Sequence, residues 1–201
     1  MPVTINGSGP IAGITSLNTS VSDTELGYLD GVTSAIQTQL NTSKGMILIT
    51  SGTLSGASVV LSSIPGTYRD LRLVIRNYKP ATDNIGLQFR LNGDSGANRY
   101  RVNQSFAIQT TFAAASFNPT YGNDNSVAQG LIIAELFDYA NSSTWKIVRF
   151  QALTNNSTTT TNPDWEMDSG IYNQVDAITS ISMFPSSGNF TSGDYFLYGV
   201  Q

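Results

Sequence analysis

The feature that most constrains the fold is an alternation of apolar and polar residues that runs through the chain from Lys44 onward. Leu71, Leu73 and Ile75 alternate with Arg72, Val74 and Arg76. Residues 87–92 repeat the pattern. A period of two places alternate side chains on opposite faces of a strand and is typical of half-buried strands. Turn signals such as Pro65-Gly66 separate these segments. The pattern therefore predicts antiparallel sheets.

Nine segments of the chain carry this strand signal. They are residues 46–49, 59–61, 71–76, 87–92, 99–102, 131–137, 145–152, 177–184 and 195–200. Many short strands joined by turns rich in Gly, Pro and Asn favour an antiparallel β-sandwich of jelly-roll type over residues 44–201. The apolar run Leu131–Phe137 predicts a central strand, and Pro185 is expected to end the strand before it.

The composition excludes most enzyme chemistry within one chain. The 201 residues include no Cys and no His, so neither a thiolate nucleophile nor an imidazole base is present. Zinc sites built from Cys or His are excluded for the same reason. Charged residues make up only 12%, against about 25% in a typical globular chain. We expect no catalytic residues, no cofactor and no metal site.

The net charge and the hydropathy exclude two classes of partner. The formal net charge is -4 at pH 7, which argues against a nucleic-acid-binding protein. No stretch approaches the roughly 20 apolar residues of a membrane-spanning helix, so we expect no membrane insertion. No signal peptide is visible at the N-terminus, and we expect the protein to be made in the cytoplasm.

Residues 1–20 differ in composition from the rest of the chain. They are rich in Gly, Ser, Thr and Asn, with a few apolar residues that include Val3, Ile5, Ile11 and Ile14. So little apolar surface cannot form a core, and the sequence predicts an extended arm. Residues 1–43 also carry three acids and no base. The charge pattern has two interpretations: solvated faces with internal ion pairs, or an acidic arm that docks on a basic partner.

Residues 21–43 carry the one convincing helical signal. Ser22 and Glu25 form a capping box. Apolar or small residues then recur at spacings of three and four, the pattern of a coiled-coil seam; they are Leu26, Leu29, Thr33, Ile36 and Leu40. A short helix that contains glycines is unstable alone. The stripe can pack against its own domain or self-associate in a parallel bundle, and we favour the bundle.

Two polar clusters have the residue types of weak ligand sites. Asp164, Glu166 and Asp168 share one face if they lie on a strand, where they can act as paired carboxylates or ligate a hard cation. The favoured interpretation is a solvated acidic loop. Asn92, Asp94 and Asn98 offer oxygens to Ca²⁺, but the Asn92-Gly93 pair is more typical of a type I′ turn.

Several aromatic residues fall in or near predicted loops, where they can stack on sugar rings or pack against the core. They are Tyr68, Tyr78, Tyr100, Tyr121, Trp145, Trp165 and Tyr172. Core and rim packing is the favoured interpretation. Loops on a rigid sandwich carry recognition, so residues 112–125 and 155–172 are the expected places for any binding role.

Four segments resemble structural proteins of tailed bacteriophages. The run VSDTELGYLDGVTSAIQTQL at 21–40 is the most specific, because it resembles a motif that recurs in fibres and trimeric stalks. The opening PVTINGSGPIAGI is similar to the openings of phage fibre proteins. Residues 67–100 and 188–200 resemble the first and last strands of jelly-roll domains in such proteins. Fibres of this kind often repeat the stalk motif, whereas this chain has one copy, so we expect a short stalk.

The resemblance implies a homotrimeric structural protein on the outer surface of the virion. Residues 1–20 are then the anchoring arm, 21–43 the trimerisation stalk and 44–201 a jelly-roll knob that faces outward. The implied partners are other copies of the chain and, through the arm, the major capsid protein or another virion protein. The alternatives are a short tail fibre that binds a host-surface glycan and a β-sandwich carbohydrate-binding module.

Overall fold

The computed structural model describes residues 45–103, 114–120, 122–128, 130–155 and 164–201, with the single residues 24, 28, 35 and 36. The chain divides into two units, Met1–Ser43 and Lys44–Gln201. Within the first unit, Thr24 and Ile36 have helical backbone, and the Ile36 side chain is exposed. The other predicted arm, cap and stalk residues lie outside the described residues: Val3, Ile5, Ile11, Ile14, Ser22, Glu25, Leu26, Leu29, Thr33 and Leu40. The stalk and the arm therefore stay predictions.

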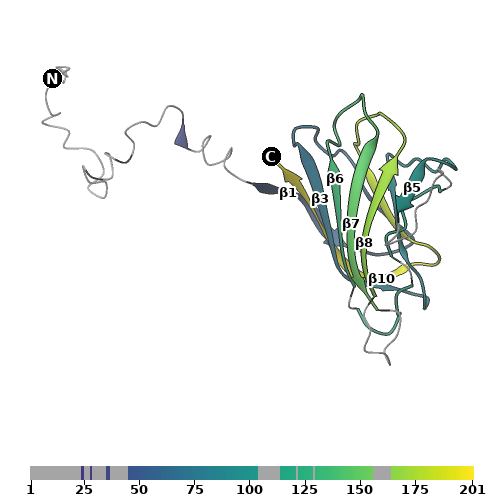
Figure 1. The fold of residues 1–201 in the computed structure, drawn as a ribbon. Coiled ribbons are helices and arrows are strands. Elements are labelled where there is room, and N and C mark those ends of the chain that lie inside the picture. The colour runs from purple at the N-terminus through teal and green to yellow at the C-terminus, as the bar shows by residue number, and fades with distance from the viewer. Residues whose placement is uncertain are drawn as a thin grey trace, which may run out of the picture. The chain divides into compact units, whose positions relative to one another are not determined.

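The second unit is mainly β, as the alternation predicts (Figure 1). Its ten strands are β1 (Met46–Thr53), β2 (Val59–Leu61), β3 (Asp70–Pro80), β4 (Leu87–Leu91), β5 (Tyr100–Asn103), β6 (Gly130–Phe137), β7 (Lys146–Thr154), β8 (Asp164–Tyr172), β9 (Ile181–Pro185) and β10 (Phe190–Val200). Nine of them correspond to the nine predicted segments. The predicted end of a strand at Pro185 is confirmed, because β9 ends at that residue.

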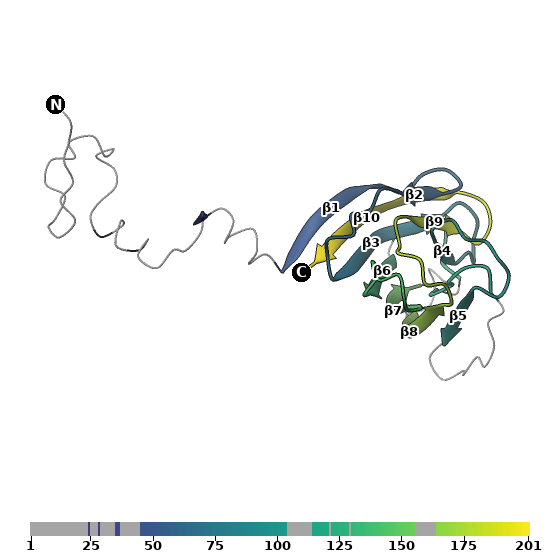
Figure 2. The ribbon, with the colours of Figure 1, turned by 90° about the horizontal axis from the view of Figure 1, so that it is seen from above.

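The strands form two antiparallel sheets. One sheet has seven strands in the order β1-β10-β3-β6-β7-β8-β5, and the other has three in the order β2-β9-β4. Viewed from above, the larger sheet is curved, and the smaller sheet lies on its concave side (Figure 2). The strand β6 has three strands on each side, which confirms the prediction that Leu131–Phe137 is central.

The hydrophobic core lies between the two sheets. Leu73 and Ile75 on β3 face inward and are fully buried, as are Phe150 on β7 and Met183 on β9. The rings of Phe89, on β4 of the small sheet, and Phe150 are stacked with centroids 5.8 Å apart. Burying one large apolar side chain contributes about 1.5–3 kcal/mol. This core between two sheets agrees with the predicted β-sandwich.

The strand that the sequence did not predict is β8. Its inward residues Glu166 and Asp168 are buried, whereas its outward residues Trp165 and Met167 are exposed. The alternation is present but inverted, with acids facing inward and apolar side chains facing solvent. The interpretation of this segment as a solvated acidic loop is therefore wrong, because β8 pairs with β7 along its whole length.

The predicted turn at Asn92-Gly93 is confirmed. Both residues have positive φ, 52° and 66°, and the Asp94 amide donates to the Leu91 carbonyl at 3.0 Å. Positive φ at both central residues defines a type I′ turn. The turn does not close a two-stranded hairpin, however, because β4 belongs to the three-stranded sheet and β5 to the seven-stranded sheet.

Candidate functional site

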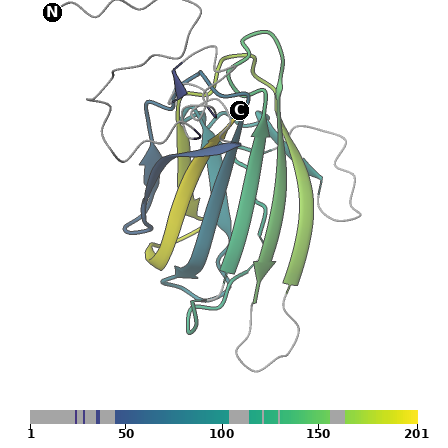
Figure 3. The same ribbon diagram turned by 90° about the vertical axis from the view of Figure 1, so that its left-hand side faces the viewer.

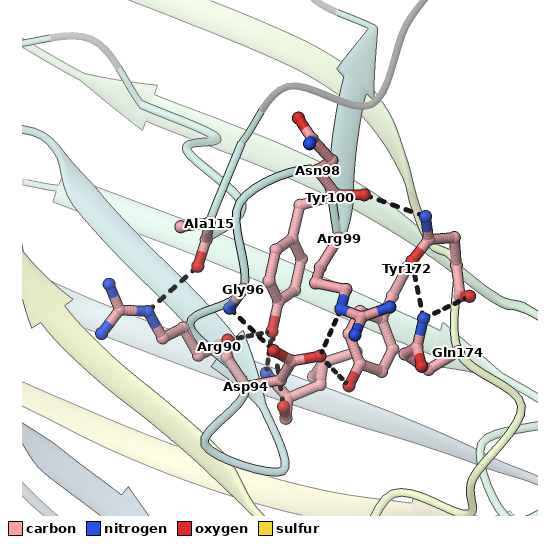
Figure 4. Close-up of polar contacts among 11 residues, drawn as sticks. Arg90, Asp94, Gly96, Asn98, Arg99, Tyr100, Ala115, Tyr172 and Gln174 are labelled. Atoms are coloured by element: carbon pink, nitrogen blue, oxygen red, sulfur yellow. Dashed lines mark hydrogen bonds and ion pairs between the residues drawn. The ribbon is translucent and has the colours of Figure 1, made fainter.

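The predicted calcium ligand Asp94 has its carboxylate engaged by the protein itself (Figure 4). One oxygen accepts the Gly96 amide at 2.8 Å, and the other accepts the Tyr172 hydroxyl at 2.9 Å. The Nε atom of Arg99 lies 3.4 Å from that second oxygen. These contacts fix the loop between β4 and β5 against β8. Within the described ranges, no three acidic side chains are placed to hold a metal ion.

The other two oxygen donors of the predicted cluster point elsewhere. The Asn92 side-chain oxygen accepts the amides of Thr179 and Ser180, at 2.9 and 3.2 Å. The Asn98 main-chain carbonyl accepts a hydrogen bond from the Asn173 side-chain amide at 2.9 Å. The structure thus assigns this cluster a role in loop structure.

Two tyrosines beside Asp94 are buried and stay protonated. Burial raises the pKa of Tyr100 to about 12. Burial, followed by the hydrogen bond to Asp94, raises the pKa of Tyr172 far above its usual range. The Tyr100 hydroxyl also donates to the Asp94 carbonyl at 2.8 Å. Both hydroxyls therefore act as hydrogen-bond donors near neutral pH.

The predicted carboxylate cluster on β8 is only partly assembled. Glu166 and Asp168 share the inner face of the strand, as a strand position predicts, and both are at least 94% buried. Both take part in polar contacts within the protein. The side chain of Asp164 lies outside the described residues. This buried pair does not form a surface cleft for substrate.

The aromatic residues divide into a buried set and an exposed pair. Tyr78, Tyr100 and Tyr172 are buried, which confirms core packing for those three. Trp145 and Trp165 are 53% and 69% exposed. Among the predicted sugar-stacking aromatics that the structure describes, only the two tryptophans are largely exposed. Tyr121 lies outside the described residues.

Trp165 belongs to an extended surface that we call the outer face, the solvent side of the seven-stranded sheet (Figure 3). Its side chains form rows across the strands, set by the ladder register. The first row contains Asp194, Arg76, Leu131, Leu153 and Trp165. The second contains Phe196, Val74, Ile133, Gln151 and Met167. The third contains Leu48, Tyr198, Arg72, Glu135 and Arg149. The last contains Met46, Val200, Asp70, Phe137, Ile147, Ile171 and Arg101.

The outer face is unusually apolar. Fourteen large apolar side chains are exposed among the described residues, and eight of them lie on this face. Two neighbouring hollows indent it and share Leu131 and Ile133. The first hollow is bordered by Leu153 and Trp165 and has Gln151 as its one polar side chain. Exposed apolar side chains gathered on one face are typical of binding surfaces, so this face is the strongest candidate for one.

Several charged residues on the outer face contact one another or an aromatic ring. Glu135 accepts hydrogen bonds from Arg72, at 3.0 Å, and from Arg149. Arg76 lies over the Phe196 ring, 5.5 Å from its centroid, and is paired in the ladder with Asp194. With Asp70 and Arg101 in the last row and Lys79 outward on β3, the strands contribute four arginines, one lysine and three acids to this face. The strands of this face therefore carry more cationic than acidic side chains.

Sequence reasoning did not find the outer face, although a signal was present. In the run Leu131–Phe137, apolar residues occupy outward positions 131, 133 and 137 as well as the inward ones. Such a run indicates a strand that is covered on both faces. The structure covers the inner face with the small sheet, whereas the outward side chains of Leu131 and Phe137 stay exposed.

Comparison with known proteins gives no identification. No protein-family model matches the sequence, and no curated protein matches it significantly. In the part of the chain that the structure describes, no helix has the length and apolar character needed to cross a membrane.

Proposed function

We propose that the chain is a non-enzymatic structural protein of a tailed-bacteriophage particle and that it works as a homotrimer on the particle's outer surface. The observation that supports this most is the outer face, because exposed apolar side chains gathered on one face are typical of a protein that functions within an assembly. The resemblance of residues 21–40 to trimeric phage stalks supports the same class independently of the fold.

The order of the strands supports a jelly-roll knob. Strands β1, β10, β3 and β6 are neighbours in one sheet, and β2, β9 and β4 are neighbours in the other. Chain segments that alternate between two sheets in this way are typical of a jelly roll. A further segment next to β4 extends the small sheet, because Phe89 and Phe117 exchange backbone hydrogen bonds of 2.9 and 3.0 Å. In this proposal β7 and β8 extend the larger sheet.

Within the particle, we favour capsid decoration. A helix of 20 residues spans only about 30 Å, so one stalk segment of this length holds the knob close to its anchor. Residues 1–20 are then the anchor to the major capsid protein or another virion protein. A short tail fibre that binds a host-surface glycan is the alternative.

The surface around Trp165 bears on the glycan alternative. An exposed tryptophan can stack on a sugar ring, but a sugar site also needs polar groups that hydrogen-bond the hydroxyls. The hollow beside Trp165 is lined by Leu131, Ile133 and Leu153, with Gln151 as the one polar side chain. This lining favours contact with another protein over contact with a sugar.

The copy number per particle tests the proposed function. A quantitative gel of purified particles is expected to give hundreds of copies for a decoration protein, whereas about a dozen copies indicate a tail component. Absence of the protein from purified particles contradicts the proposal. Glycan-array binding by the full chain would instead support the receptor-binding alternative.

A further inference from the structure

The two hollows on the outer face differ in chemistry. The first is apolar and is bordered by Trp165. The second is lined by two arginines, Arg72 and Arg76, among other residues. Leu131 and Ile133 line both hollows, so the two adjoin. The outer face therefore places a cationic hollow directly beside an apolar one.

The ladder register places the two hollows along one row of side chains. Arg76 is paired with Leu131, Leu131 with Leu153, and Leu153 with Trp165. The row therefore crosses the four neighbouring strands β3, β6, β7 and β8. Neighbouring strands lie about 4.8 Å apart, so the two ends of the row are about 14 Å apart. A ligand that contacts both ends must be a chain of several residues or a molecule of similar length.

Two cations on β3 are not neutralised by carboxylates of the described part of the chain. Arg76 is paired in the ladder with Asp194, yet the two side chains form no ion pair, and the guanidinium lies over the Phe196 ring. Lys79 also forms no ion pair there and donates to the Ser126 carbonyl at 3.3 Å. A guanidinium beside an apolar hollow is well placed to bind a carboxylate that a partner supplies.

The charge of the whole chain restricts which anion can approach. The formal net charge is -4, which disfavours a long polyanion such as nucleic acid or an anionic membrane, because both experience the field of the whole protein. A short segment with one or two carboxylates meets mainly the local cations of β3. Such a segment can also fill the apolar hollow, as nucleic-acid phosphates cannot.

We propose that the outer face binds a short segment of another protein that carries both an acidic and a large apolar residue. The apolar side chain fills the hollow beside Trp165, and the carboxylate binds Arg76. Strands β3 and β7 are separated only by β6, a distance of about 10 Å that about three residues of extended chain can span. The inference goes beyond the proposed function, because it names the chemistry of a partner whether or not the chain is a trimer.

Selection from a random library of displayed short peptides tests the inference, with the purified full-length chain as bait. We expect the enriched peptides to share a large apolar residue and an Asp or Glu near it. A selected peptide is then synthesised and added to the Trp145→Phe variant, in which Trp165 is the one remaining tryptophan. Trp165 is 69% exposed without a ligand, so we expect a blue shift of its emission and weaker acrylamide quenching on binding.

Two matched substitutions locate the site. Arg76→Gln removes the proposed carboxylate partner and is expected to weaken binding of the selected peptide about tenfold. Arg90→Gln is the control, because Arg90 also lies over an aromatic ring, that of Phe184 at 4.5 Å, but is on the three-stranded sheet. It is expected to leave the affinity unchanged. Circular dichroism verifies that both variants retain the β fold.

Each other occupant gives a different result. A selection that enriches no peptides, or peptides without acidic residues, overturns the inference, as does equal binding by the Arg76→Gln and Arg90→Gln proteins. Trp165 that is already shielded in the purified protein shows that another copy covers the face. A blue shift with vesicles of phosphatidylserine and phosphatidylcholine, but not with the peptide, shows that the ligand is a membrane. None of these results changes the copy number per particle, which tests the proposed function separately.

Discussion

Four tyrosines lie in the core of the described domain, and each hydroxyl donates a hydrogen bond. Tyr78 donates to the Ile85 carbonyl at 3.2 Å, and Tyr139 donates to the Pro65 carbonyl. Tyr100 and Tyr172 both donate to Asp94. Because buried polar groups must be satisfied, these bonds allow large rings to fill the core while tying loops to strands.

The first prediction is that the protein loses stability in alkaline solution. Burial raises the pKa of all four tyrosines, that of Tyr100 to about 12. The ordinary tyrosine pKa is about 10, so above this pH the unfolded chain releases protons that the folded chain retains. Stability is complete below pH 10 and falls as the pH rises above it, by about 1.4 kcal/mol per pH unit for Tyr100 and in the same direction for the other three tyrosines.

Urea unfolding at pH 8, 10 and 11 measures this effect, with tyrosinate absorbance as a second readout. The buried Lys146 opposes it, because burial lowers the pKa of its ammonium. The Lys146 ammonium makes the free energy of unfolding rise with pH below its ordinary pKa. We expect the opposite effect of the four tyrosines to be larger. Equal unfolding midpoints at pH 8 and pH 11 contradict the assignment of these tyrosines to the core.

The second prediction concerns the bond between Tyr172 and Asp94. Tyr172→Phe removes a donor to a carboxylate and keeps the ring, so we expect a loss of about 1.5–3 kcal/mol in the free energy of unfolding. Chemical denaturation measures it. Tyr28→Phe is the control, because that ring is 77% exposed and its hydroxyl is expected to be neutral. If the Tyr172→Phe protein is as stable as the control, the hydrogen bond between Tyr172 and Asp94 does not contribute to the free energy of unfolding.

At the scale of the elements, strand positions are predictable wherever inward residues are apolar. The alternation at residues 71–76 and 87–92 predicts β3 and β4 because Leu73 and Phe89 face the core. It does not predict β8, because Glu166 and Asp168 face inward there. A prediction from hydrophobic patterning assumes that the side of a strand that faces the core is apolar. In β8 the side that faces the core is acidic, and the apolar side chains face solvent.

The third prediction concerns the packing of β8. A Cβ atom added at Gly170 would lie 2.5 Å from a ring carbon of Phe117 and 3.2 Å from the Arg101 carbonyl oxygen. Overpacking of a core costs about 1–3 kcal/mol, and we expect Gly170→Ala to lower the unfolding free energy by this amount. Gly66→Ala is the matched control, because its Cβ meets only Ala140, at 3.7 Å. Equal melting temperatures for the two variants contradict the close contact between β8 and Phe117.

At the scale of the whole molecule, the sequence predicts a β domain but not which of its faces exposes apolar side chains. An alternating pattern assigns side chains to the two faces of a strand. It does not say which part of the molecule covers each face. Leu131 and Leu153 on the outer face are as apolar as the buried Ile132 and Ala152. Only the placement of the small sheet determines which set is the core and which is left for a partner.

The fourth prediction concerns attachment to the particle. Residues 1–20 contain apolar side chains but too few to form a core. In our account they supply the anchor. Deleting residues 2–20 is expected to leave a folded oligomer with unchanged circular dichroism that no longer binds particles lacking the protein. If the truncated protein binds such particles as well as the full chain does, the anchor lies in the knob.

The central claim is that this chain works as an assembly of identical copies, and the mass of the wild-type protein in solution tests it most directly. Multi-angle light scattering at micromolar concentration is expected to give three times the chain mass of 21.5 kDa. The measured mass is expected to stay constant on dilution, as for a tightly associated trimer. A mass of one chain at micromolar concentration contradicts the trimeric stalk and with it the proposed homotrimer.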